Sequence, residues 1–241
     1  MGEAEWTLRL PVSPLGLRGS IGEEVHHNGA IKLRAAMFQS EWYLGQEPRQ
    51  RSAEETRCAA RILWDEQRPA WMSPLVEWLR EVRVYRDWWL KQLSAPVDRS
   101  DMTTRLDEDG LRLWSVLSNW SQSRATQAKA RWVIEKAKLA FPSQLADLDF
   151  FPEVLAFRPG FSAPEQGLSP SVLADGLLTA LLQLTAVAGA KEGSTLAFDE
   201  MENQLHPFAI RVILAAMRED AERKGLTILL TTHSPEVLRN V

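Results

Sequence analysis

Apolar and polar residues alternate near the N-terminus, over residues 6–10 and again over 31–35. Successive side chains of a strand point to opposite faces, so this period of two predicts β-strands that bury one side. Asn28 and Gly29 stand just before the second run and favour the tight turn of a hairpin. We therefore expect residues 1–50 to form an antiparallel β segment.

From residue 51 to residue 145 the apolar residues recur at spacings of three and four, which is typical of amphipathic helices. This segment is expected to be a mostly helical insertion or lever region. The pattern predicts helices over residues 52–66, 72–82, 111–120 and 126–141. A short strand is expected at 82–85 and a hairpin over 145–160.

The remaining part, residues 146–241, alternates helices with uninterrupted apolar strands. A helix at 175–189 precedes the apolar run 195–198, and a helix at 207–223 precedes the run 226–230. Such strands are typical of a parallel sheet that is covered on both faces. The sequence therefore predicts an α/β fold with a parallel sheet flanked by helices, with antiparallel hairpins beside it.

Composition narrows the class of protein. The 241 residues are 45% hydrophobic and 25% charged, an ordinary globular balance, and the formal net charge of −4 argues against coating nucleic acid through the overall field. The single cysteine, Cys58, excludes an internal disulfide framework, and no apolar run approaches the about 20 residues that span a bilayer. We expect a cytoplasmic protein with no membrane partner. All ten tryptophans lie within residues 6–132, where packing and base stacking both remain open roles.

The strongest candidate chemistry follows the 195–198 strand, where Asp199 and Glu200 stand side by side. Open α/β sheets bind ligands at the carboxyl ends of their strands. One carboxylate there can hold Mg²⁺, while its neighbour, which points the other way, can orient or deprotonate an attacking water. Strands also commonly end in solvated acids, so the pattern alone leaves both interpretations open.

A second candidate, His233, follows the next apolar strand in the segment TTHSP at 231–235. Because neighbouring strands of a parallel sheet end at one edge, we expect His233 to face the same site as Glu200. A histidine there can sense a γ-phosphate, although a lone histidine is more often a surface or capping residue. Ser234 and Pro235 suit the cap and the first turn of a following helix.

Together these segments resemble the RecF/SMC-like class of ABC ATPases, and most closely its AAA-type ATP-binding proteins of the OLD and anti-phage kind. LAFDEMENQLHP at 196–207 is similar to the family's Walker B and D-loop region, and 231–235 to its switch-histidine segment. LADG at 173–176 occupies the place of the signature motif, and 84–117 resembles the family's insertion. The resemblance covers roughly residues 80–241 and implies an ABC-ATPase-like P-loop NTPase fold.

The resemblance implies ATP and Mg²⁺ as ligands and a role for each residue at the strand ends. Asp199 would be the magnesium residue, Glu200 the catalytic base, and His233 the sensor of the γ-phosphate. It also implies a DNA-linked machine of repair or phage defence, with DNA or a nuclease as further partners.

The signature segment is implied to act on a second subunit. Asp175 and Gly176, preceded by Ala174, would reach the γ-phosphate of ATP bound to that subunit, so that ATP lies between the two. A helix N-terminus presents free N–H groups to an anion, which gives this role a physical basis. The simpler interpretation is a helix cap. Ala174 replaces the serine that is usual in the family and removes one hydroxyl donor.

The phosphate-binding loop of the family, G-x-x-x-x-G-K-[ST], does not occur in the 241 residues. Residues 16–22 are glycine-rich but contain no Lys-Ser or Lys-Thr pair. The first parallel strand and this loop are therefore expected to be missing from the fold. Three explanations remain: a truncated or split ATPase whose Walker A segment lies on another chain, a degenerate regulatory subunit without turnover, or an unrelated α/β domain.

Overall fold

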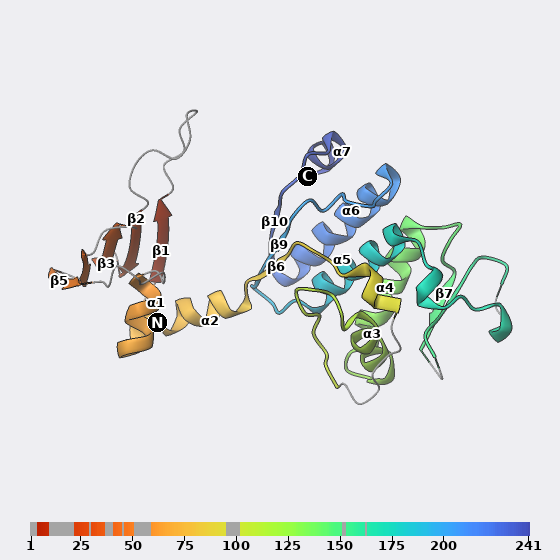
Figure 1. Cartoon of the computed structure of the whole chain (residues 1–241), viewed down its shortest axis with the longest axis horizontal. Helices are drawn as coiled ribbons and strands as arrows, with labels where there is room; N and C mark the ends of the chain where they lie inside the picture. Colours follow the sequence, from red (N-terminus) through yellow and green to blue (C-terminus); the bar gives the residue numbers. More distant parts are fainter. Residues whose placement is uncertain are drawn as a thin grey trace. The chain divides into compact units, whose positions relative to one another are not determined.

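The computed structural model describes residues 4–9, 22–28, 30–36, 41–44, 46–50, 59–94, 102–150, 153–161 and 163–241. The chain divides into two compact units, Met1–Arg80 and Glu81–Val241 (Figure 1). Each unit has its own apolar core. The division into three segments at residues 50 and 145 stays a prediction. Several positions discussed above lie outside the described residues: most of 16–22, Gly29, Cys58 and the start of the helix expected over 52–66.

The first unit contains a five-stranded antiparallel sheet whose strands follow chain order. The strands are β1 (Ala4–Arg9), β2 (Gly22–His27), β3 (Ala30–Ala36), β4 (Glu41–Leu44) and β5 (Glu47–Gln50). Helix α1 (Ala59–Gln67), the short 3-10 helix η1 (Ala70–Met72) and helix α2 (Ser73–Glu81) follow. Leu33 of β3 and Leu63 of α1 are both fully buried in one apolar cluster, so α1 packs on the sheet. The predicted antiparallel β-structure is confirmed, although the alternation indicated only two of the five strands.

The second unit is built on a three-stranded parallel sheet in the order β10-β9-β6. Its strands are β6 (Arg83–Tyr85), β9 (Thr195–Phe198) and β10 (Thr227–Leu230). A separate antiparallel hairpin pairs β7 (Asp147–Asp149) with β8 (Leu155–Phe157). The predicted α/β class, a parallel sheet with helices and antiparallel hairpins, is confirmed.

The helices of the second unit are η2 (Leu90–Ser94), α3 (Leu113–Gln122), α4 (Gln127–Ala140), η3 (Pro164–Gln166), η4 (Pro170–Val172), α5 (Asp175–Gly189), α6 (Pro207–Lys224) and α7 (Pro235–Asn240). Four of them, α3, α4, α5 and α6, fall within a few residues of their predicted limits, whereas the short 3-10 helices were not predicted. Gly225 ends α6 in the left-handed region at φ 65°, where its N–H donates to the Ala221 carbonyl. Among the described residues, none of the helices combines the length and apolar character that crossing a bilayer requires.

Helix α5 lies at the centre of this unit. All of its residues from Leu177 to Ala188 are buried, and it packs against α3, α4 and α6. Two tryptophans of α3 are buried nearby: Trp114 and Trp120 donate their indole N–H groups to the carbonyls of Leu93 and Thr104, at 2.8 and 2.9 Å. These two side chains serve packing, with their single polar group satisfied.

The sheet is covered on one face only in the part of the unit that the structure describes. On the core face Phe198 is buried and Tyr85 stacks on it, with 5.2 Å between the ring centroids. Figure 1 shows α4, α5 and α6 on that side of the sheet. On the other face Val84 and Leu229 are 42% and 56% exposed. The prediction of a sheet buried on both faces is therefore wrong here, because an apolar run shows what a strand is able to bury and not whether a cover is present.

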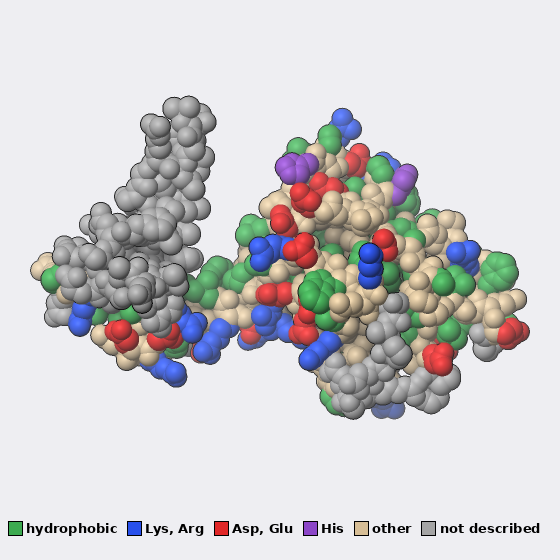
Figure 2. All heavy atoms as spheres, in the orientation of Figure 1, with side chains coloured by type: hydrophobic (Ala, Val, Ile, Leu, Met, Phe, Trp, Pro, Cys, Tyr) green, Lys and Arg blue, Asp and Glu red, His purple; other side chains and the backbone are tan. Residues whose placement is uncertain are grey.

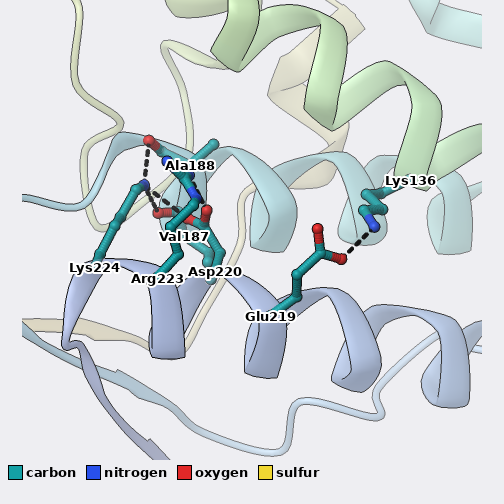
Figure 3. A network of polar contacts seen from close by, with 7 residues as sticks. All are labelled: Lys136, Val187, Ala188, Glu219, Asp220, Arg223 and Lys224. Atoms are coloured by element: carbon teal, nitrogen blue, oxygen red, sulfur yellow. Dashed lines mark hydrogen bonds and ion pairs between the residues drawn. The ribbon is translucent and has the colours of Figure 1, made fainter.

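A buried polar network closes the C-terminal end of α5 (Figure 3). Lys224 donates through Nζ to the carbonyls of Val187 and Ala188, at 3.0 and 2.8 Å, and lies 2.7 Å from the Asp220 carboxylate. Asp220 is 1% exposed and also pairs with Arg223. Burial lowers the pKa of Lys224, and the paired carboxylate opposes that shift. The last carbonyls of α5, which have no partner within the helix, are thus bonded to a cation.

We expect Lys224→Met to lower the free energy of unfolding by about 2–3 kcal/mol, since it leaves a buried carboxylate with only an exposed arginine as partner. Lys136→Met is the matched control: Lys136 forms an ion pair with Glu219 at 2.5 Å, but the Glu219 side chain is 59% exposed. Such an exposed pair contributes about 0–1 kcal/mol. Urea unfolding followed by circular dichroism measures both losses, and equal losses would contradict the buried network.

Candidate functional site

The pairing of β9 with β10 brings the predicted residues to one edge of the sheet. Phe198 pairs with Leu230, so Asp199 and Thr231 follow side by side. The N–H of Thr231 donates to the Phe198 carbonyl at 3.0 Å, and the N–H of Asp199 donates to the carbonyl of Tyr85 in β6 at 2.9 Å. The carboxyl ends of all three strands therefore meet where ligands of open α/β sheets bind.

Thr231 holds both acids through its hydroxyl group. The hydroxyl donates to Oδ1 of Asp199 and accepts the backbone N–H of Glu200 at 2.8 Å. The sequence pattern did not identify this threonine as part of the site, because its partners lie more than 30 residues away along the chain. In the sequence, Thr231 stands out only as the first residue of the TTHSP segment at 231–235.

Glu200 occupies an unusual backbone conformation, with φ at 48°. This left-handed region is sparsely populated by residues other than glycine, and such strain persists where neighbours hold it. Asn203 donates through Nδ2 to Oε2 of Glu200 at 2.8 Å. Oε1 of the same carboxylate lies 3.7 Å from Nε2 of His233, whose side chain is 88% exposed. The structure thus brings Glu200 and His233 together, at a distance that suits an ion pair when the histidine is protonated.

Asp199 offers oxygen ligands of the kind that Mg²⁺ prefers. Among the described residues, no group of three or more histidine, cysteine, aspartate or glutamate side chains could hold a metal ion by itself. Magnesium is commonly held by one or two carboxylates together with phosphate oxygens of a substrate. The exposed carboxylate of Asp199 fits this second arrangement, in which the metal ion arrives with a nucleotide.

Glu202 fixes the loop that carries the histidine. Its Oε1 accepts the backbone N–H groups of His233 and Ser234, at 2.7 and 3.0 Å. Burial alone would raise the pKa of Glu202, but hydrogen bonds from its own backbone N–H, from the Thr232 side chain and from these two N–H groups hold it below its usual value. Sequence reasoning missed this residue, since its partners lie 31 and 32 residues further on.

The predicted cap of the following helix is confirmed. The side chain of Ser234 accepts the N–H of Glu236 at 3.2 Å, with Pro235 in the first turn of α7. The loop from Thr231 to Ser234 is therefore fixed at both ends.

The signature segment begins α5. Ala174 is its N-cap residue in extended conformation, at φ −64° and ψ 140°, and it has no side-chain cap. Asp175 is exposed in the first turn. Among the described residues, no hydrogen bond or ion pair joins positions 174–176 to Asp199, Glu200 or His233. The implied role of 174–176 toward a second subunit stays a prediction.

Helix α5 holds the loop that follows the two acids. A Cβ atom on Gly176 would lie 2.5 Å from the carbonyl oxygen of Gln204, so the close approach of these backbones requires glycine. Seven residues further on, Gln183 donates through Nε2 to the carbonyl of Met201 at 2.7 Å inside the core. The loop of residues 200–204 is thus attached both to α5 and to the histidine loop.

Comparisons with known proteins place the chain in a family. The protein-family model described as "AAA domain, putative AbiEii toxin, Type IV TA system" matches residues 94–239, more than half of the chain. No curated protein matches significantly. Among solved structures, the SmcHead bound to the C-winged helix domain of ScpA is similar, with a TM-score of 0.44 and 14% identity over 92% of this chain. The match spans 62% of that solved chain.

The hydrogen bonds that Glu202 accepts from the N–H groups of His233 and Ser234 predict a pH-dependent contribution to the stability of the fold. Its pKa is lowered in the folded chain, so the contribution is fully present above the unfolded pKa of about 4.5 and is lost as pH falls through the folded value. We expect Glu202→Gln to cost about 1–2 kcal/mol at pH 7, the difference shrinking to zero at low pH. Urea unfolding from pH 7 to pH 3 measures this difference. Glu222→Gln, at an exposed position of α6, is the control and should not lower the free energy of unfolding at any of these pH values. If the loss caused by Glu202→Gln does not change with pH, the hydrogen bonds to the Glu202 carboxylate do not stabilise the fold as described.

The uncapped N-terminus of α5 predicts a stabilising substitution. Ala174→Ser should raise the free energy of unfolding by about 1 kcal/mol, because its hydroxyl can accept one of the free N–H groups of the first turn. Ala174→Gly is the matched control and should change stability by only a few tenths of a kcal/mol. Thermal and urea unfolding check both; a serine variant no more stable than the glycine variant would show that this end needs no cap.

Proposed function

The chain belongs to the AAA-domain family whose model it matches, and from this premise we propose that it is the ATP- and Mg²⁺-binding subunit, or part of one, of a RecF/SMC-like ATPase of the OLD kind. One observation carries the proposal. Asp199, Glu200 and His233 come from two strand ends and meet at one edge of a parallel sheet, with Glu200 and His233 3.7 Å apart. A metal-binding carboxylate and a residue that orients the attacking water are recurring parts of phosphoryl-transfer sites, and a protonated histidine can stabilise charge on the phosphoryl group.

In the proposed reaction, water attacks the γ-phosphorus of ATP and the bond to the β–γ bridging oxygen breaks. Glu200 orients the water and accepts its proton, and the hydrogen bond from Asn203 aims the carboxylate. His233, when protonated, donates to an oxygen of the transferring phosphoryl group. Magnesium, held by Asp199, would neutralise charge on the phosphates.

We propose further that ATP lies between two subunits. The N-terminus of α5, at Ala174, Asp175 and Gly176, would then face the γ-phosphate bound by the second subunit, with its free N–H groups as donors. The uncapped first turn of α5 supports this proposal, because the N-cap residue Ala174 makes no side-chain hydrogen bond to its N–H groups. A DNA-linked role in repair or phage defence, with DNA or a nuclease as partner and a cytoplasmic location, is the biological setting we propose.

The phosphate-binding segment is proposed to come from elsewhere, because the 241 residues contain no G-x-x-x-x-G-K-[ST] motif. That segment supplies the backbone N–H groups and the lysine that hold the β- and γ-phosphates. We therefore expect little turnover from this chain by itself.

A second candidate function is a regulatory subunit that binds partners without hydrolysing ATP. Ala174 favours it, since a signature serine would contribute a hydroxyl donor to a charged phosphate. The retained set of Asp199, Glu200 and His233 favours the first proposal, because an idle site has no chemical need for all three.

Calorimetry with Mg²⁺ and ATP tests the proposal. We expect the purified chain to bind weakly, Asp199→Ala to weaken binding by about tenfold or more because a metal ligand is lost, and turnover to stay far below ~1 per second. Glu192→Ala, at an exposed acid before β9, is the control and should bind as the parent chain does. Binding that Asp199→Ala leaves unchanged would contradict the magnesium role. Turnover near ~1 per second would remove the need for a second polypeptide.

A further inference from the structure

We propose that a pocket of the first unit binds a small molecule in which a flat apolar ring carries an anionic group, a carboxylate or a phosphate. The pocket has a volume of about 270 Å³ and is lined by residues of β3, β4, α1 and the turn into η1. Drug-sized ligands occupy pockets of about 300–1,000 Å³, so this one suits a single ring with a short acidic arm. The proposal goes beyond the proposed function, because the pocket consists of residues of the first unit.

Most of the pocket lining is apolar. Leu63 of α1 is fully buried, and Leu44 of β4 packs against the same core. Pro69 and Trp71 add two rings to the lining. Aromatic side chains bury a large apolar area and pair with other rings in offset or edge-to-face arrangements. This lining therefore favours a flat apolar ligand.

The turn after α1 fixes the position of these two rings. Arg68 has a φ of 44°, a region that residues other than glycine populate sparsely, and its N–H donates to the carbonyl of Trp64 at 3.2 Å. The carbonyl of Pro69 accepts the N–H of Met72 at 2.9 Å, and the Met72 side chain is buried in the core. A ligand that enters a wall already held in place loses little affinity to ordering it.

A β-bulge in β3 explains how a charged side chain reaches this apolar pocket. Val25 of β2 pairs with Leu33, whereas its neighbour His26 pairs with a residue two positions earlier in β3. Lys32 is therefore the extra residue of the bulge, a distortion that re-aims a side chain relative to the regular alternation of a strand. Its half-buried side chain lines the pocket together with residues from the core side of the sheet.

Lys32 gives the pocket a cation with no partner among the described residues: none of them forms an ion pair with its ammonium group. Gln67, at the exposed end of α1, adds an amide that can donate a hydrogen bond. An anion that enters the pocket would accept a charge-assisted hydrogen bond from the ammonium group, which is stronger than a bond between neutral groups.

Charge separates this pocket from the candidate ATP site. Acidic side chains and a histidine gather where β9 and β10 of the second unit end (Figure 2). An anion is repelled there unless a metal ion accompanies it. Among the described residues that line the pocket of the first unit, Lys32 alone carries a charge. We therefore expect the pocket to bind an organic anion without Mg²⁺.

A set of small probes tests the ligand class on the full chain, in EDTA and without nucleotide. The acids 3-phenylpropionate and phenyl phosphate carry the ring with either anionic group, 3-phenylpropionamide carries the ring alone, and acetate carries the charge alone. We expect one of the two acids to shift the methyl NMR signals of Leu44 and Leu63 with a dissociation constant of about 1 mM or lower, and the amide and acetate to bind at least about tenfold more weakly.

The tighter of the two acids identifies the anionic group of the ligand. The proposal is overturned if neither acid shifts these signals at about 10 mM, or if the amide binds as tightly as the acids.

Lys32→Met tests the cation, since methionine keeps an apolar chain and removes the charge. The variant should bind the acidic probe about tenfold more weakly and the amide unchanged; unchanged binding of the amide also shows that the pocket is still formed. Lys91→Met is the matched control, because Lys91 is an exposed lysine of η2 in the second unit. Equal effects of the two substitutions on the acid, or none from Lys32→Met, would refute the role of Lys32.

Asp199→Ala separates this proposal from the proposed function. The variant should bind the acidic probe as the parent chain does, because Asp199 belongs to the second unit. Loss of probe binding in this variant would mean that the probe binds at the strand ends, and would overturn the pocket. A chain that binds the probe but not ATP keeps the pocket and loses the proposed function, and one that binds ATP but no probe does the reverse.

Discussion

Complete burial of α5 is the constraint on which the rest of the second unit depends. A helix whose residues from Leu177 to Ala188 are all buried has no solvent face, so other elements must surround it. Helices α3, α4 and α6 do so, and Lys224 bonds the carbonyls at its C-terminal end. At the other end Gly176 touches the backbone of Gln204. The packing of α5 thus sets the position of the loop after the two acids, through residues that are not themselves candidates for the reaction.

The local geometry of the site favours a functional interpretation of the acids over a solvated strand end. A carboxylate that is merely solvated does not require a strained backbone conformation. At Glu200 the φ of 48° lowers the stability of the fold by about 1–3 kcal/mol. Thr231, Asn203 and Glu202 hold this loop and the histidine loop against that cost with hydrogen bonds. The same bonds bring Glu200 toward His233. Strain that is held so completely is characteristic of sites that must be preorganised.

The sequence predicted the long elements and the meeting of the strand ends, because both follow from local periodicity and from the rules of parallel sheets. It did not predict Glu202 or Thr231 as members of the site, since their partners lie 31 or more residues away and no spacing signals them. Nor did it predict the exposure of Leu229. The run LTILL is apolar enough to be buried on both sides, but a pattern within one strand carries no information about which segment covers it.

The acids of the site and the absence of a phosphate-binding motif from the 241 residues belong to one physical problem. Asp199, Glu200 and Glu202 concentrate negative charge where a nucleotide would bring more. Two like charges about 4 Å apart repel by about 1 kcal/mol in water and by about 4 kcal/mol near a protein surface, unless cations intervene. Cations that bind beside these carboxylates would weaken that repulsion for the phosphates as well. Binding of the cations and binding of the nucleotide would then be linked, and linkage is reciprocal: whatever factor the cations contribute to nucleotide affinity, the nucleotide contributes to the affinity for the cations.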